Sequence, residues 1–474
     1  MTDGKTIEAP EAPTRANGAR ERAALLPGEA RGEPGVRPRV VVVGAGFGGL
    51  AVARELAGSE VDVLLLDRNN YHGFWPLLYQ VATAGLEPES VAYPVRAIIR
   101  KHGNADFLMA EVSGVDFEQR EVLTDGGAVR YDYLVLAAGS ANNYFGNNAL
   151  AEHTLGMKDV DEAERLRNHV LTCFEHAVRE HDPERRRALL TFAIIGGGPT
   201  GVELAGAFRE LISHVLHKDY PMLDIGEARV VMIEAMDKIL ATFPPRLQEN
   251  ARRRLESFGV EVRLNSPVAQ VEHETITFKD GSTLPAVTVI WAAGVRAAKL
   301  ADALAVEQGR AARVKIEPTL HLPSRPEVFV IGDMAYLEGY KPGVAYPMVA
   351  QVAIQMGKLA AQNLLRQARG EHMQTFKYFD PGQMATIGRS SAVFDAFGIR
   401  LTGFIAWVGW LFIHLMYLVG FRNRLVVFAN WFYNYITYDR GVRLILWTDY
   451  QRREEIDEGE PVAMPTPLQQ EAVR

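Results

Sequence analysis

Two segments of the chain repeat one order of elements: an apolar strand, a glycine-rich turn, a helix and a second apolar strand. The first segment runs from Val40–Val43 to Val61–Leu66, and the second runs from Phe192–Ile195 to Val230–Ile233. Unbroken runs of β-branched residues are typical of a parallel sheet whose faces are both covered by helices. The pattern therefore predicts an α/β protein with two doubly wound, Rossmann-like dinucleotide-binding domains.

The first glycine-rich turn has the spacing G-x-G-x-x-G, with glycines at Gly44, Gly46 and Gly49. In such a turn the first glycine permits the tight bend and the second lets the backbone approach a pyrophosphate, while the third packs the helix on the sheet. Asp67 stands at the end of the next strand, where a carboxylate accepts hydrogen bonds from ribose hydroxyls. These residues predict a dinucleotide site.

The second glycine-rich turn repeats this arrangement with Gly196, Gly198 and Gly201. Its acidic partner is Glu234, which lies farther along the chain than the usual spacing of about 20 residues. We expect residues 213–228 to be an insertion that accounts for the excess. A carboxylate at this position predicts NADH rather than NADPH because it repels a 2′-phosphate, although nearby Lys238 weakens that preference.

The overall charge and the cysteine count exclude several classes of protein. With 51 Lys and Arg against 58 Asp and Glu, the net charge is −7, whereas a nucleic-acid-binding protein needs a basic surface. The single cysteine, Cys173, excludes an internal disulfide, a Cys-x-x-Cys redox pair and a cysteine-rich metal centre, and we expect a buried thiol. No histidine spacing indicates a metal site. Two dinucleotide sites without redox cysteines predict a resident flavin and an exchanging nicotinamide nucleotide.

The last hundred residues contain two strongly apolar stretches. Leu401–Phe421 holds 21 residues without a formal charge. A helix of that length is about 31 Å long and just spans a bilayer core of about 30 Å. The second stretch, Leu425–Ile436, is too short to span. One true membrane span is therefore the first of two open alternatives.

The second alternative is a helix that lies in the membrane surface. A less apolar face recurs every four residues, at Thr402, Ala406, Trp410 and His414 and again at Asn430, Asn434 and Tyr438. The stretches are flanked by basic residues that suit anionic lipid headgroups: Arg422, Arg424, Arg440 and Arg443. We favour this interfacial reading, in which a helix with one polar stripe is held by the headgroups.

Six further segments carry motifs of their own: Pro76–Ala82, Ala137–Gly139, Ala292–Gly294, Val330–Asp333, Ala350–Gln355 and Phe376–Arg389. With them, over about residues 38–440, the chain resembles the type II NADH:quinone oxidoreductases, which are single-subunit, non-proton-pumping NADH dehydrogenases. The resemblance implies that FAD occupies the first site, with further contacts from Ala138, Gly139, Gly332, Asp333 and Lys377. It also implies that NADH occupies the second site, which includes Gly294, and that two electrons pass to a membrane quinone.

The resemblance assigns roles to five side chains, and each role has a plainer alternative. Asp333 would bind the flavin ribityl chain, or serve as a turn residue. Gln351 and Gln355, four residues apart, would bind the quinone, or bond each other on a solvated face. Lys377 would lie near the isoalloxazine ring, or on the surface. Glu203 would orient the nicotinamide or relay protons to quinone, or stabilise a helix N-terminus.

We expect five segments: a disordered tail (1–37), the FAD-binding domain in two parts (38–157 and 298–368), the NADH-binding domain (158–297) and a membrane-anchoring C-terminal region (369–474). The expected partners are a membrane quinone and the bilayer surface on the cytoplasmic face of the cell membrane, with a homodimer left open. Two rivals stay open, a ferredoxin-type reductase and a non-catalytic redox-sensing membrane flavoprotein. A sulfide:quinone oxidoreductase needs a pair of thiols, which one cysteine cannot supply.

Overall fold

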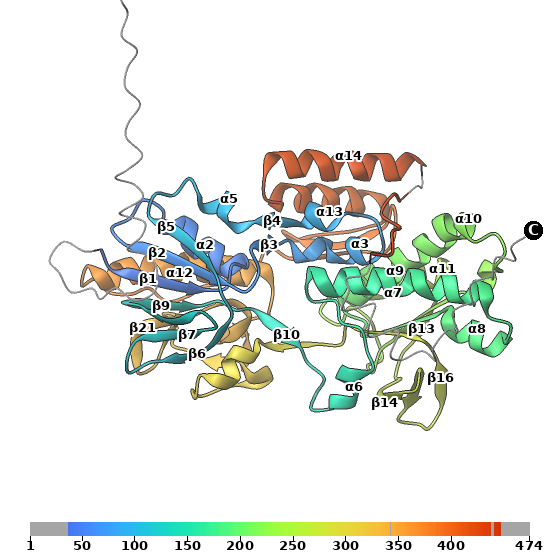
Figure 1. Cartoon of the computed structure of the whole chain (residues 1–474), viewed down its shortest axis with the longest axis horizontal. Coiled ribbons are helices and arrows are strands. Elements are labelled where there is room, and N and C mark those ends of the chain that lie inside the picture. The colour runs from blue at the N-terminus through green and yellow to red at the C-terminus, as the bar shows by residue number, and fades with distance from the viewer. Residues whose placement is uncertain (1–36, 342, 438–439, 447–474) are drawn as a thin grey trace, which may run out of the picture.

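The computed structural model describes residues 37–341, 343–437 and 440–446 of the chain (Figure 1). Two α/β units lie side by side, and a pair of C-terminal helices covers the junction between them (Figure 1). The predicted disordered tail lies, except for Arg37, outside the described residues.

The first unit is built on a six-stranded sheet with the order β20-β21-β9-β1-β2-β5. Its strands are β1 (Arg39–Val43), β2 (Asp62–Asp67), β5 (Ala105–Met109), β9 (Tyr133–Leu136), β20 (His321–Leu322) and β21 (Arg325–Val330). All neighbouring pairs are parallel except β20 with β21. Every residue of β1 is buried, as the valine run predicts for a central strand.

Two helices of the first unit pack closely because both have glycine at the contact. They are α2 (Phe47–Glu55), which follows the first glycine turn, and α12 (Ala350–Ala368). A Cβ atom on Gly357 of α12 would lie only 2.5 Å from the carbonyl oxygen of Gly48. This contact brings the start of α12, with Gln351 and Gln355, close to the first glycine turn.

The second unit is built on a parallel four-stranded sheet with the order β13-β12-β11-β17. Its strands are β11 (Thr191–Ile195), β12 (Arg229–Ile233), β13 (Val260–Arg263) and β17 (Thr288–Trp291), and its main helices are α7 (Val160–Arg179), α9 (Pro199–Leu211) and α11 (Pro245–Ser257). Phe192 of β11 is stacked between Phe174 of α7 and Phe208 of α9, with ring centroids 5.8 and 6.1 Å apart. Cys173 is buried, as predicted.

Two short antiparallel strands, β10 (Ser140–Asn142) and β18 (Val295–Ala297), carry the chain between the two units. Two three-stranded antiparallel sheets extend the units: β6 (Val112–Asp116), β7 (Glu121–Thr124) and β8 (Gly127–Arg130), and β14 (Val268–Glu272), β15 (Thr275–Phe278) and β16 (Thr283–Pro285). The chain therefore folds as the predicted α/β protein with two doubly wound sheets.

The C-terminal region begins with a small antiparallel sheet, β25 (Gln383–Thr386), β26 (Ala392–Ala396) and β27 (Ile399–Thr402). Helix α13 (Gly403–Tyr417) follows, and then α14 (Phe421–Thr437). The uncharged stretch 401–421 is thus not one 21-residue helix, because β27 takes its start and Gly420, with φ +87°, separates the two helices. None of the helices in the described part of the chain combines the length and the apolar character needed to cross a membrane.

The less apolar stripe of these helices faces the protein, which corrects the prediction that it meets lipid headgroups. Ala406 and Trp410 are buried, and the Asn434 amide donates to the Gly85 carbonyl. Large apolar side chains point outward instead: Phe404, Ile405, Val408, Phe412 and Met416 on α13, and Phe421, Leu425, Phe428, Phe432 and Ile436 on α14. Tyr438, the last member of the predicted stripe, lies outside the described residues.

Candidate functional site

The three glycines of the first turn meet three different requirements. Gly44 has φ +105°, and a Cβ atom there would lie 2.3 Å from the carbonyl oxygen of Ala137 on the neighbouring strand. A Cβ atom on Gly49 would lie 1.8 Å from the carbonyl oxygen of Gly44. Nothing lies within 4 Å of a Cβ atom on Gly46, so the backbone is open to a ligand at that position. This division of labour is the one that a pyrophosphate-binding turn requires.

The second turn has the same geometry. Gly196 has φ +119° and approaches the carbonyl oxygen of Ala292, which would lie 2.5 Å from an added Cβ atom. The corresponding distance from Gly201 to the carbonyl oxygen of Gly196 is 2.0 Å, and the space at Gly198 is open. The structure therefore places both predicted sets of turn glycines in matching positions at the carboxyl ends of β1 and β11.

The two acidic residues also occupy equivalent places. Asp67 accepts hydrogen bonds from the backbone N–H groups of Ala45, at 2.7 Å, and Asn69, at 2.8 Å. Glu234 accepts from Gly197, at 2.7 Å, and Met236, at 2.9 Å. Burial raises the pKa of Asp67, and the two N–H donors oppose that rise. Each carboxylate therefore stabilises its turn, and ribose binding by either one stays a prediction.

The other residues predicted for the FAD site gather at the same edge of the first sheet. Asp333 lies in a 3-10 turn (Gly332–Met334) directly after β21, and the Ser140 hydroxyl donates to its Oδ2 at 2.5 Å. The backbone N–H of Ala138 lies 3.2 Å from the sulfur of Met334. Since β9 pairs with β1 and β21 pairs with β9, all three parallel, these loops lie at the same sheet edge as the first glycine turn. The open backbone at Gly46 and the carboxylates at this edge fit a flavin dinucleotide.

Glu203 lies where α9, β25 and α13 meet a short helix, α3 (Leu78–Ala82). Its Oε1 accepts a hydrogen bond of 3.3 Å from the backbone N–H of Thr386. The buried indole nitrogen of Trp410 faces the same carboxylate, without a hydrogen bond of normal geometry in the described part of the chain. Burial raises the pKa of Glu203 to about 8, so this side chain is mostly protonated at neutral pH.

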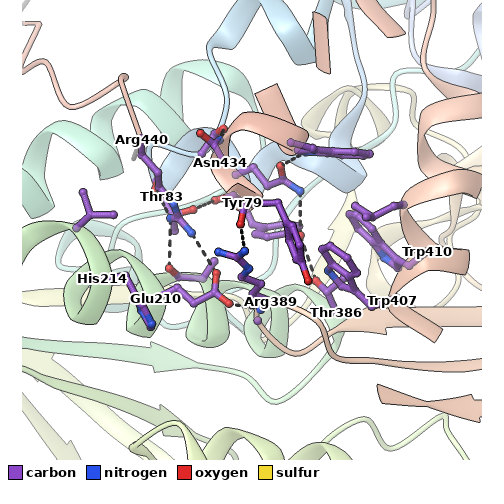
Figure 2. A pocket seen from close by; sticks show the side chains of 18 residues that line it. Tyr79, Thr83, Glu210, His214, Thr386, Arg389, Trp407, Trp410, Asn434 and Arg440 are labelled. Carbon is purple, nitrogen blue, oxygen red and sulfur yellow. Dashed lines mark hydrogen bonds and ion pairs between the residues drawn. The ribbon is translucent and has the colours of Figure 1, made fainter. Parts of the chain in front are cut away.

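A cavity of about 120 Å³ is lined by residues that surround this carboxylate, whereas Glu203 itself is not part of the lining (Figure 2). Aromatic side chains from both C-terminal helices form one part of its lining, and Tyr79, Thr386 and Trp410, which surround Glu203, belong to it. The Tyr79 hydroxyl hydrogen-bonds the Thr386 hydroxyl at 3.1 Å and accepts from the Gln80 amide at 3.0 Å. A flat apolar molecule with polar oxygens suits such a lining.

A buried charge cluster forms another part of the cavity lining, seen at the left of Figure 2. The Arg440 guanidinium lies 3.2 Å from Glu210 and donates to the carbonyl oxygen of Thr83 at 2.7 Å. The backbone N–H of Arg389 also donates to Glu210. Burial raises the pKa of Glu210, and Arg440, Arg389 and Arg254 oppose that rise. Arg440 therefore binds the protein interior, so the prediction that it binds lipid headgroups is wrong.

Comparisons with known proteins agree with this geometry. Residues 38–357 match the family model "Pyridine nucleotide-disulphide oxidoreductase", and residues 381–438 match "NDH2 C-terminal domain". The chain is 40% identical over 438 residues to the type II NADH:quinone oxidoreductase Ndh of Mycobacterium tuberculosis, covering 89% of this chain and 93% of the relative. It is 39% identical to NdhA of the same organism, over 86% of this chain and 90% of the relative. The chain belongs to the type II NADH:quinone oxidoreductases.

The structure of NDH2 from Plasmodium falciparum in complex with NADH has the same fold as this oxidoreductase. The TM-score is 0.78 at 19% identity, and the match covers 87% of this chain and all of that one. The family resemblance that the sequence motifs indicated is thus confirmed. The curated relatives are matched over nearly their whole length, including the C-terminal region that a ferredoxin-type reductase would not require.

None of the five side chains to which the family resemblance assigns a role belongs to the cavity lining. The Gln355 amide donates to the Phe379 carbonyl at 2.8 Å and accepts from the Phe379 N–H at 3.0 Å, so both its polar groups bind backbone. Gln351 lies half-buried in the first turn of α12, and Lys377 is exposed. Their predicted contacts with quinone and flavin stay predictions.

Sequence reasoning assigned no role to Tyr79, Thr386, Glu210 or Arg389. Tyr79, Thr386 and Arg389 stand inside motifs that were noted for the family resemblance, Pro76–Ala82 and Phe376–Arg389. Those motifs were the available signal. The pairing itself depends on chain segments separated by 307 residues in the case of Tyr79 and Thr386, and no local pattern reveals such a contact.

Proposed function

We propose that this oxidoreductase oxidises NADH at the second glycine turn, holds FAD at the first and reduces a membrane quinone in the cavity beside Glu203. The observation that carries the proposal is the position of Glu203, whose pKa burial raises to about 8, behind residues of a cavity that the apolar C-terminal helices help to line. FAD supplies the redox chemistry, accepting a hydride and releasing two electrons. The protein positions the reactants and supplies a proton to the quinone.

Each turn, with its carboxylate, has the groups that its proposed occupant requires. Glu234 and the second turn would hold the adenosine ribose of NADH and repel the 2′-phosphate of NADPH. Asp67, the first turn and the Ser140–Asp333 pair would hold the ribose, pyrophosphate and ribityl chain of FAD. The turn glycines and the carboxylates of the two nucleotide sites therefore occupy equivalent positions in the two α/β units.

In the overall reaction NADH + quinone + H⁺ → NAD⁺ + quinol, one hydrogen comes from NADH with the two electrons, and Glu203 is placed to supply the other proton. Its pKa, raised to about 8, keeps it mostly protonated at neutral pH. Glu203 accepts from the backbone N–H of Thr386, and the Thr386 hydroxyl pairs with that of Tyr79 in the cavity lining. The proposal requires the carboxyl proton to pass from Glu203 to this hydroxyl pair, and from there to a bound quinone oxygen. No proton pumping is required by this arrangement.

The outward apolar face of α13 and α14 is the proposed contact with the bilayer. Phe404, Val408, Phe412 and Met416 recur every four residues and are at least 45% exposed. Such a row inserts into one leaflet of a membrane and brings the cavity close to the lipid that contains the quinone. We place this contact on the cytoplasmic face, and a homodimer stays a prediction that sedimentation of the detergent-solubilised enzyme tests.

A combined assay tests the function. The flavin-loaded protein should oxidise NADH in the presence of a short-chain quinone, and oxidise NADPH much more slowly. It should float with liposomes, whereas the double variant F404E/F412E should stay in solution and keep its activity with the soluble quinone. Absence of quinone-dependent NADH oxidation would remove the enzymatic proposal, and flotation of the double variant would remove the lipid-contact proposal.

A further inference from the structure

An exposed phenylalanine lies directly over one end of the second nucleotide site. A Cβ atom built on Gly294, just beyond β17, would be 3.1 Å from Cζ of Phe145. The Phe145 side chain is nonetheless 68% exposed, so its outer face meets no other part of the described protein closely. Its ring centroid lies 6.3 Å from that of the buried Trp291, in an edge-on arrangement.

The backbone that carries this ring is strained and held in place. Phe145 has φ +52°, a left-handed conformation that bulky residues rarely adopt. Its N–H donates to Asn143 Oδ1 at 3.0 Å. Asn143 in turn donates to the Gly294 carbonyl at 3.1 Å and accepts from the Trp291 indole at 3.1 Å. Strain that the surroundings maintain at a ligand site points to a function for the side chain it presents.

The position over Gly294 corresponds to the nicotinamide end of a bound dinucleotide. In the sheet order β12-β11-β17, Glu234 follows β12 and Gly294 follows β17, so these residues flank the glycine turn on opposite sides. With the adenosine ribose at Glu234 and the pyrophosphate at the turn, the other half of NADH extends toward β17. That side leads through β18 to the FAD-binding unit.

We propose that Phe145 is the aromatic cover of the nicotinamide site, stacking on the face of the nicotinamide ring that is turned away from the flavin. A phenyl ring suits this partner because nicotinamide is flat and its oxidised form carries a positive charge. The cover positions the ring for hydride transfer and excludes water from it. The inference rests on the proposed placement of NADH at the second turn.

The test compares ligands with and without nicotinamide. Replacing Phe145 by Ala should weaken NAD⁺ binding by about fivefold or more, the loss expected for one stacking contact, and leave ADP-ribose binding unchanged. FAD content and the KM for quinone should not change, and Phe145→Trp should restore NAD⁺ affinity. Equal weakening of NAD⁺ and ADP-ribose, or no weakening of either, would overturn the assignment.

Phe397 provides a matched control. Like Phe145, it is exposed (66%) and has a left-handed backbone (φ +54°), and it precedes a left-handed glycine, Gly398. It lies at the β26–β27 hairpin, so Phe397→Ala should leave both affinities unchanged. The variant Glu234→Gln separates the two proposals, because it should weaken both ligands. If it weakens neither, the NADH placement fails. If it weakens both while Phe145→Ala weakens neither, only the role of Phe145 fails.

Discussion

The glycine turns and the cavity beside Glu203 are built in different ways. Each turn is made of backbone, and in both copies the first and third glycines lie where a Cβ atom would approach a carbonyl oxygen within 2.5 Å. The cavity is made of side chains from α3, α9, β25, α13, α14 and the segment that follows α14. A backbone site is specified by residues a few positions apart, whereas the cavity exists only after distant segments pack.

This difference explains why one site is duplicated and the other is not. A strand, a turn and a helix form a unit that positions its own carboxylate. Asp67 and Glu234 make equivalent hydrogen bonds to the backbone of their turns, although Glu234 lies farther along the chain from its turn than Asp67 does. The cavity depends on an interface with the C-terminal region, which occurs once among the described residues. Variants at the two kinds of site should therefore fail in different ways.

The largest effect is expected at the first turn. Gly44→Ala places a methyl group against the Ala137 carbonyl and imposes a left-handed backbone on alanine. Strain and overpacking together should lower the free energy of unfolding by about 3 kcal/mol or more and abolish FAD retention. Thermal unfolding and flavin absorbance measure both. Gly46→Ala, where the space is open, should keep the fold and lose only FAD affinity; equal stability of the two variants would contradict this account.

The next effect is expected at Glu203. The variant Glu203→Gln removes the proton donor, so steady-state quinone reduction should fall by about 10²-fold, while flavin reduction by NADH in a stopped-flow experiment changes little. Wild-type quinone reduction should decline above about pH 8, where the carboxyl loses its proton. An unchanged pH profile in the variant would exclude Glu203 as the donor.

Stability gives a second readout for Glu203. A carboxyl whose pKa is raised in the folded protein favours folding while protonated, and that contribution is lost as the pH rises from the unfolded value, about 4.3, to about 8. The melting temperature of the wild type should fall through this window relative to that of Glu203→Gln.

The same contrast between local contacts and contacts of distant segments explains how much of the structure the sequence could predict. The spacing of Gly44, Gly46 and Gly49 after a valine run was enough to predict the turn and its acidic partner, because those contacts are local. The four-residue stripe through Ala406, Trp410 and His414 was also real, but the side it faces was predicted wrongly. A stripe beside an apolar face has the same sequence pattern whether it contacts headgroups or a protein surface.

The partner of Arg440 was predicted wrongly for a related reason. Arg440 and Gln355 bind groups that are far away in the sequence, namely Glu210 and the backbone of Phe379. A buried cation needs a partner, but sequence alone does not say that a given arginine is buried. For Arg440 the protein interior therefore supplies the partner that the sequence analysis placed in the lipid.

The smallest of these effects is expected where Arg440 holds the end of the C-terminal region against α9. Arg440→Met keeps most of the side-chain volume but leaves Glu210 and the Thr83 carbonyl without this donor. The free energy of unfolding should fall by about 2 kcal/mol, and the KM for quinone should rise because one part of the cavity lining loosens. The matched change Arg422→Met, at an exposed position on α14, should alter neither quantity.

The KM for NADH should stay constant in both variants, since the second glycine turn depends on its own backbone and on Glu234. A rise in the KM for NADH that matches the rise for quinone would show that the two sites do not behave as separately built units.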